Sequence, residues 1–265
     1  MVRIGVTQWS VDSSGVETVH RAAALGFSAI HLDAGDLESD LLLDKKALQQ
    51  AYRQAAQTAG VEITAIAPGF ANSYGLTSPP DSDNARHCWR LIQIAIDAAA
   101  QMAVPLVFVP SFRAGEIRTE HDLLRTAEVL RDACAYAANY DLLVATENTL
   151  GVSDNLKLIE AVSHPKLRIL MDTLNPVLWG HKPAAMIEGL WPYICHQIHA
   201  KDGLNNVMGN AVLGTGQADF VACVEKLRSF GFAGTVISEN DYQGDRASNV
   251  ATDIAVIAEL FHQDN

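Results

Sequence analysis

The sequence predicts an α/β fold, a (β/α)8 TIM barrel, because eight strand-like segments alternate with eight helix-like segments. Short runs rich in β-branched residues are followed by longer runs of helical period that carry Ala, Leu, Arg and Glu. Repeated strand–helix units are typical of a parallel sheet covered by helices. A length of 265 residues is ordinary for one such barrel. We therefore expect a single TIM-barrel domain over residues 1–265.

The expected strands span residues 2–7, 28–33, 61–67, 105–109, 142–147, 167–172, 194–199 and 235–239. The expected helices lie near residues 13–25, 44–59, 82–102, 119–139, 153–163, 183–190, 217–230 and 245–262. Gly26 and Gly60 follow two helical stretches, as C-terminal cap glycines do, and Ser82 and Ser153 precede two others, as N-caps do. A doubly wound open sheet is the competing fold. It usually has fewer units, and no G-x-G-x-x-G follows the first strand to favour it.

Composition and charge exclude several classes of function. The chain is 49% hydrophobic and 19% charged, which indicates a large core. Its formal net charge of −12 argues against passive nucleic-acid binding, which needs basic surfaces. No apolar run has the length of a membrane span, and the first ten residues lack the layout of a signal peptide. The four cysteines are scattered without a C-x-x-C pair, which favours reduced thiols and a cytoplasmic protein.

Four polar residues end the last four expected strands: Glu147, Asp172, His199 and Glu239. Catalytic groups of a barrel come from the C-terminal ends of its strands and the loops after them. Because strand side chains alternate between faces, all four are expected to point into the barrel mouth, while His196 faces the packing side. Taken singly, each carboxylate would more often be a cap or a surface charge. Taken jointly, they indicate a shared site.

Three carboxylates that converge without a counter-charge would repel one another. Buried charges persist only where they are paired or bound to a metal. Three carboxylates and one imidazole form an oxygen-rich set that suits Mn²⁺ or Mg²⁺, with Co²⁺ or Zn²⁺ as further options. A structural tetrahedral zinc would be expected to use cysteine, and none is near. The sequence therefore predicts one divalent metal ion held by Glu147, Asp172, His199 and Glu239.

The chain resembles the xylose isomerase-like TIM-barrel superfamily, which includes sugar-phosphate isomerases and epimerases, inosose dehydratases and endonuclease IV-type DNA-repair enzymes. The resemblance covers nearly the whole chain and rests on the segments ATENT (145–149), LMDTLN (170–175), IHAKD (198–202), GTGQADF (214–220) and ISEN (237–240). It implies a metal that chelates a sugar carbonyl and a neighbouring hydroxyl, and an enediolate intermediate. It also makes Glu147 and Glu239 the candidate catalytic acid/base pair, one on each side of the substrate.

Further residues are candidates for substrate binding. Lys201 shares the inward face with His199 and could hold a substrate oxyanion or phosphate, or pair with a carboxylate. Trp9 and Trp179 follow the first and sixth strands and could stack on a sugar, although a loop tryptophan is as often a packing residue. Asp33 ends the second strand and could bind a hydroxyl.

The loop LGTGQADF, residues 213–220, follows the seventh strand and opens a helix. It could bind a phosphate at the helix N-terminus, as loops at this place in barrels often do. A plain glycine turn is at least as good an interpretation of the same residues.

The chain departs from the patterns of two branches of the superfamily. Endonuclease IV-type enzymes hold extra zinc ions with histidines, but Asn175 stands at one of those places, and the third and fourth strands end in IAPGF and FVPSF. Free-ketose epimerases usually carry a histidine at the place of Asn175, a glutamate at that of Ser153 and an arginine at that of Asn205. These groups grip the sugar, so Asn175 is expected to contact the substrate in a different way.

We therefore predict a divalent-metal-dependent isomerase or epimerase that acts on a small sugar, ketose or sugar phosphate. The alternative is an inosose-type dehydratase, a lyase that uses the same metal site. An endonuclease IV-like DNA phosphodiesterase and a non-catalytic barrel are less favoured. The expected partner is a small-molecule sugar, without nucleic acid or membrane. The oligomeric state, a homo-oligomer included, is left open.

Overall fold

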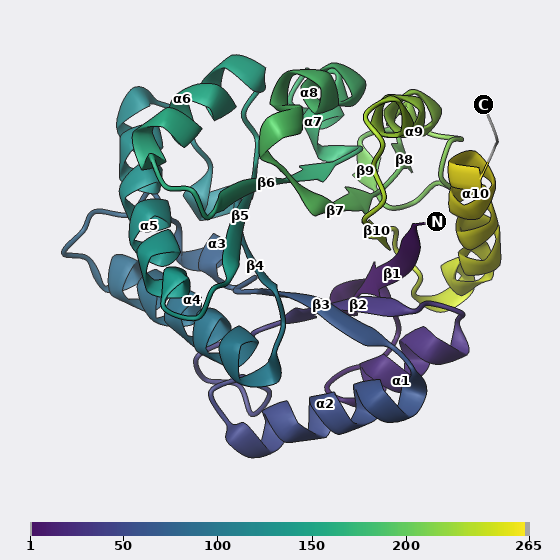
Figure 1. The fold of residues 1–265 in the computed structure, drawn as a ribbon, viewed down its shortest axis with the longest axis horizontal. Coiled ribbons are helices and arrows are strands. Elements are labelled where there is room, and N and C mark those ends of the chain that lie inside the picture. The colour runs from purple at the N-terminus through teal and green to yellow at the C-terminus, as the bar shows by residue number, and fades with distance from the viewer. Residues whose placement is uncertain (1, 263–265) are drawn as a thin grey trace. The chain divides into compact units, whose positions relative to one another are not determined.

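The computed structural model describes residues 2–262 and confirms the predicted barrel. Eight strands close in the order β1-β10-β7-β6-β5-β4-β3-β2 (Figure 1). Their bounds are β1 Arg3–Thr7, β2 Ala29–Asp33, β3 Glu62–Ala67, β4 Leu106–Ser111, β5 Leu143–Asn148, β6 Leu167–Asp172, β7 Ile194–Ala200 and β10 Thr235–Ser238. The helices are α1 Glu17–Ala24, α2 Lys46–Ala59, α3 Ala71–Tyr74, α4 Asp83–Met102, α5 Glu120–Ala138, α6 Val152–Val162, α7 Asn175–Leu178, α8 Pro183–Leu190, α9 Phe220–Ser229 and α10 Val250–His262.

Contacts within the described chain cluster into two compact units. The first unit takes in residues 2–31, 54–63 and 170–262, and the second takes in residues 32–53 and 64–169. In the first unit, β1 pairs in parallel with β10 and β2, β10 pairs with β7, and α9 contacts both α8 and α10. In the second, β4 pairs in parallel with β3 and β5, and α4 and α5 pack against β4 and β5 (Figure 1). That residues 1–265 form one domain stays a prediction.

The helix ends follow local backbone chemistry. Gly26 and Gly60 have φ values of 94° and 68° just after α1 and α2, a region that glycine enters without steric cost. Ser82 caps α4 by accepting a backbone N–H of the first turn, as predicted. The N-cap predicted at Ser153 is wrong, because α6 begins one residue earlier and its N-cap is Gly151. The side chain of Asn155, inside α6, binds the carbonyl of Gly151 instead.

A short hairpin after β7 was not predicted. Strands β8 Gly203–Leu204 and β9 Val207–Met208 pair in antiparallel register. Asn205 and Asn206 form the turn with φ values of 57° and 61°, the two positive values that a type I′ turn requires. The Asn–Asn pair was a usable signal, but strands of two residues are too short to show alternation.

The strand pattern places the polar site residues on the inner side of the sheet. In β7, Cys195, Gln197 and His199 are buried, but so are Ile194 and Ile198 of the other parity, so the inward direction of His199 follows from its contact with His31 of β2. The predicted packing role of His196 is wrong, because its side chain is exposed. Alternation gives the direction of a side chain but not the depth to which it is covered. None of the helices within residues 2–262 is long and apolar enough to cross a membrane.

Candidate metal centre

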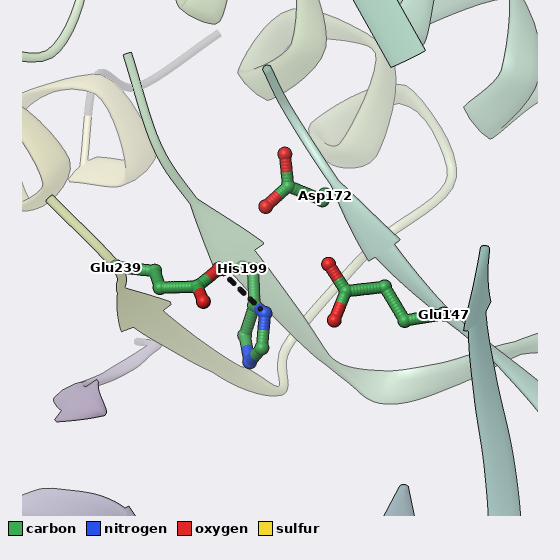
Figure 2. Close-up of side chains that lie close together, drawn as sticks. All are labelled: Glu147, Asp172, His199 and Glu239. Carbon is green, nitrogen blue, oxygen red and sulfur yellow. Dashed lines mark ion pairs between the residues drawn. The ribbon is translucent and has the colours of Figure 1, made fainter. Parts of the chain in front are cut away.

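The four predicted ligands come together. Glu147, Asp172, His199 and Glu239 each offer one ligand atom, and these atoms all lie within 4.8 Å of one another. Figure 2 shows the four side chains pointing toward a common space, from the ends of β5, β6, β7 and β10. Oxygen ligands at about 2.0–2.6 Å from one ion lie no more than about 5 Å apart. The group could therefore hold a metal ion.

Lys201 supplies a positive charge to this group. Its Nζ lies 2.7 Å from Oε2 of Glu239 and 3.1 Å from Oδ2 of Asp172. It also donates to Oδ1 of Asn175 at 3.1 Å. The structure thus shows the pairing with carboxylates that the sequence had left as one of two options for Lys201. Three carboxylates and one ammonium leave two negative charges, which a divalent cation would balance.

Glu239 is held ionised by its neighbours. Burial raises the pKa of Glu239, but the ammonium of Lys201 and the imidazole of His199 outweigh it and hold the pKa well below its usual range. Oε2 of Glu239 lies 3.0 Å from Nδ1 of His199, the contact marked by the dashed line in Figure 2. Its other oxygen, Oε1, accepts the indole N–H of Trp9 at 2.8 Å. Trp9, predicted as a sugar-stacking residue, therefore orients Glu239, while 38% of its surface stays exposed.

Asp172 is fixed by the backbone that follows it. Its Oδ1 accepts the N–H groups of Leu174 at 2.7 Å and Asn175 at 2.6 Å, at the start of the short helix α7. The other oxygen, Oδ2, faces Lys201. One oxygen thus anchors the side chain, and the second is directed into the group of ligands.

Two further buried residues, His31 and Gln197, form a chain of contacts that ends at His199. Nε2 of His199 lies 3.1 Å from Nδ1 of His31, and Nε2 of His31 lies 2.7 Å from Oε1 of Gln197. Burial lowers the pKa of His31 to about 3, with His199 acting in the same direction. Sequence reasoning missed this contact, because only the inward parity of His31 on β2 pointed to it.

The side chain of Asp202 binds the backbone of the loop formed by residues 213–220. The carboxylate of Asp202 accepts the N–H groups of Gly214, Gly216 and Ala218 at 2.9, 2.9 and 3.0 Å. The N–H of Thr215 donates to a carbonyl of the preceding turn, and that of Gln217 donates to the carbonyl of residue 203. These five backbone donors are therefore already engaged. A phosphate could use these N–H groups only by displacing Asp202 or the two backbone carbonyls, so the structure favours the glycine-turn interpretation of the loop.

Asp33 belongs to the second unit and ends β2. Its Oδ1 accepts the N–H of Gly35 at 2.6 Å. A Cβ added at Gly69 would lie 2.1 Å from Oδ2 of Asp33, so this close approach requires glycine. Burial raises the pKa of Asp33 to about 6, against the opposing hydrogen bonds from the backbone of Gly35 and Gly69.

This raised pKa predicts a pH dependence of stability. Between about pH 4 and pH 6 the folded protein binds a proton at Asp33 that the unfolded chain has released, so stability falls as pH rises through this window. We expect the melting temperature of Asp33→Asn to lack this part of the decline. Melting curves across pH 4 to 7 measure it, with the exposed Asp44→Asn as control. Parallel curves for wild type and Asp33→Asn would contradict the assignment.

Asn175 and Trp179 are the remaining residues that were predicted to bind substrate. Asn175 contacts Lys201 through its side chain and Asp172 through its backbone. Trp179 follows α7 and is 38% exposed. A role in substrate binding stays a prediction for both, and likewise for Trp9, Asp33 and Lys201.

Comparisons with known proteins support the barrel fold. A family model described as a xylose isomerase-like TIM barrel matches residues 19–260. The chain is 34% identical over 257 residues to a 2-epi-5-epi-valiolone 7-phosphate 2-epimerase of an Actinoplanes species, covering 95% of this chain and 92% of the relative. A xylose isomerase domain protein from Planctomyces limnophilus is similar in structure, with 22% identity, a TM-score of 0.79, and 97% and 96% of the two chains covered. A D-tagatose 3-epimerase-like protein has 18% identity, a TM-score of 0.81, and 98% and 97% coverage. At these identities, the two structures support the fold alone.

Proposed function

Because the chain belongs to the xylose isomerase-like TIM-barrel family, we propose that it is a divalent-metal-dependent epimerase of a small phosphorylated sugar or cyclic polyol ketone. The curated relative supports this activity, since its name describes 2-epimerisation of a 7-phosphate and the alignment covers 95% of this chain. The predicted isomerase or epimerase activity thus agrees with the comparisons, and the dehydratase alternative is not favoured.

The observation that carries the proposal is the close group of three carboxylates and one imidazole. We assign the metal to Glu147, Asp172, His199 and Glu239, whose ligand atoms lie within 4.8 Å of one another. The oxygen-rich set suits Mn²⁺ or Mg²⁺. When bound, such an ion stabilises the negative charge that develops on a substrate oxygen as the neighbouring carbon loses its proton.

Epimerisation needs one group that removes a proton and a second that returns it on the other face. Glu239 and Glu147 are the proposed pair. In the resting protein, Lys201 at 2.7 Å lowers the basicity of Glu239 Oε2. A substrate oxyanion that drew Lys201 toward itself would raise the pKa of Glu239 and make it a better base. Substrate binding would thereby prepare the proton acceptor.

Hydrogen exchange at the substrate carbon tests the proposed reaction. With Mn²⁺ and 2-epi-5-epi-valiolone 7-phosphate or a ketohexose phosphate in deuterium oxide, we expect deuterium at the carbon next to the ketone, followed by NMR. Removal of the metal with a chelator should abolish the exchange, because the developing charge loses its main stabilisation. The unphosphorylated ketose serves as control and is expected to react more slowly.

Other products would point to other functions. An enone absorbance with loss of water would favour the dehydratase. Metal-dependent nicking of abasic-site DNA, lost in Glu147→Gln, would favour a phosphodiesterase. A small-molecule sugar is the proposed partner, while the oligomeric state and the cytoplasmic location stay predictions.

A further inference from the structure

His31 and Gln197 form a chain of hydrogen bonds that ends at His199. Nε2 of His199 lies 3.1 Å from Nδ1 of His31, and Nε2 of His31 lies 2.7 Å from Oε1 of Gln197. His31 and His199 are fully buried, and Gln197 is 8% exposed. His31 comes from β2 and the other two from β7, with β1 and β10 between these strands in the sheet. The contact therefore crosses the barrel interior.

With Oε1 of Gln197 facing Nε2 of His31 and with both rings neutral, the three groups can place their protons in one way. Oε1 of Gln197 is an acceptor, so Nε2 of His31 carries a hydrogen and donates it. A neutral imidazole has one N–H, so Nδ1 of His31 is an acceptor and Nε2 of His199 must donate to it. His199 then turns a lone pair at Nδ1 toward Oε2 of Glu239, 3.0 Å away.

We propose that His31 is a positioning residue which, together with Gln197, fixes His199 as the Nε2–H tautomer and so directs its Nδ1 lone pair toward a divalent cation. The proposal rests on the metal site proposed above and adds two residues to it. Outer hydrogen-bond partners of a ligating histidine set its tautomer and ring orientation, and their loss typically lowers metal affinity.

The same geometry identifies the alternative tautomer of His199 that His31 disfavours. Without an acceptor at Nε2, His199 would gain most by placing its proton on Nδ1 and donating it to Oε2 of Glu239 at 3.0 Å. That hydrogen bond would occupy the ligand atom of His199 and one oxygen of Glu239 together. His31 removes this competing state before any metal arrives, because it captures the only proton of the neutral ring.

The tautomer of His199 can be read directly in the metal-free wild-type protein. In protein labelled with ¹⁵N in its histidine rings, NMR correlations between ring nitrogens and carbon-bound protons separate a protonated from an unprotonated nitrogen. We expect Nε2 of His199 to be protonated and Nδ1 to be unprotonated. A proton on Nδ1 of His199 would overturn the proposal. This measurement needs no variant and no metal.

Variants then test the consequence for metal binding, with Mn²⁺ as the probe in titration calorimetry. His31→Leu is expected to move the proton of His199 to Nδ1 and to weaken Mn²⁺ binding by about 10- to 100-fold. His31→Asn, whose side-chain oxygen can accept near the position of Nδ1, should restore most of the affinity. His196→Leu, at the exposed histidine of β7, is the matched control.

Two outcomes separate this proposal from the metal site itself. If wild-type protein binds no Mn²⁺, the metal site fails, and the tautomer in metal-free protein still decides the role of His31. If Mn²⁺ binds but His31→Leu changes neither the tautomer nor the affinity, the metal site stands and the role of His31 is refuted. Should His31→Leu not fold, Gln197→Leu keeps both histidines and tests the same chain of hydrogen bonds.

Discussion

Replacing Glu239 by glutamine is expected to lower epimerisation by about 10²- to 10⁴-fold, the range typical of a lost acid–base group. The substitution keeps the size of the side chain and an oxygen that can accept the Trp9 indole N–H, seen at 2.8 Å. It removes the negative charge that faces Lys201 and His199. Mn²⁺ affinity should fall with the activity, because one charged ligand is lost. Deuterium exchange and Mn²⁺ titration measure the two effects.

Glu188→Gln is the matched control for this variant. Glu188 lies in α8, pairs with Lys226 at 3.2 Å and is largely exposed, so the same chemical change occurs outside the site. We expect its activity and Mn²⁺ affinity to match those of the wild type. Normal turnover in Glu239→Gln would remove Glu239 from both of its proposed roles. Normal Mn²⁺ affinity with lost turnover would leave it as acid/base alone.

Lys201→Met is expected to destabilise the metal-free protein by about 3–5 kcal/mol, the cost of removing one partner from a buried ion pair. Lys201 is 5% exposed and lies within 3.1 Å of both Asp172 and Glu239. Its loss leaves their charges facing each other and raises the pKa of Glu239, whose lowering depends largely on Lys201. Mn²⁺ should restore much of the stability, because it supplies the missing positive charge. Chemical unfolding with and without Mn²⁺ measures this difference.

The control for this variant removes the same charge at the surface. Lys226→Met breaks the partly exposed pair with Glu188, which should change stability by no more than about 1 kcal/mol and independently of Mn²⁺. A metal-free Lys201→Met protein as stable as the wild type would show that the carboxylates need no counter-charge. A stability that Mn²⁺ leaves unchanged would argue that the ion does not bind among these carboxylates.

Residues at the ends of predicted strands were accessible from the sequence. Glu147, Asp172, His199 and Glu239 each follow an apolar run, and parallel strands in a barrel bring such positions to one end. The face on which each side chain lies can also be inferred from the local sequence, because alternation along β7 separates His196 from His199. For these reasons, the fold and the group of four could be predicted without knowledge of any contact between strands.

The partners of these residues could not be predicted in the same way. Whether Lys201 faces substrate or carboxylates depends on where Asp172 and Glu239 stand relative to it. The contact of His31 with His199 joins residues 168 positions apart across the barrel. Periodicity places each residue on a face but contains no information about which residues of that face meet. Those contacts are defined only in the closed barrel.

The bond between Trp9 and Glu239 has a consequence for how the protein is made. The two residues are 230 positions apart in the chain, and the strands that carry them, β1 and β10, are neighbours in the sheet. During synthesis, β1 leaves the ribosome before β10 and gains this partner only after β10 has followed. Contacts of such sequence separation form late, because a long loop must first close. The nascent chain therefore cannot assemble the full set of four candidate ligands until Glu239, which follows β10, has been translated.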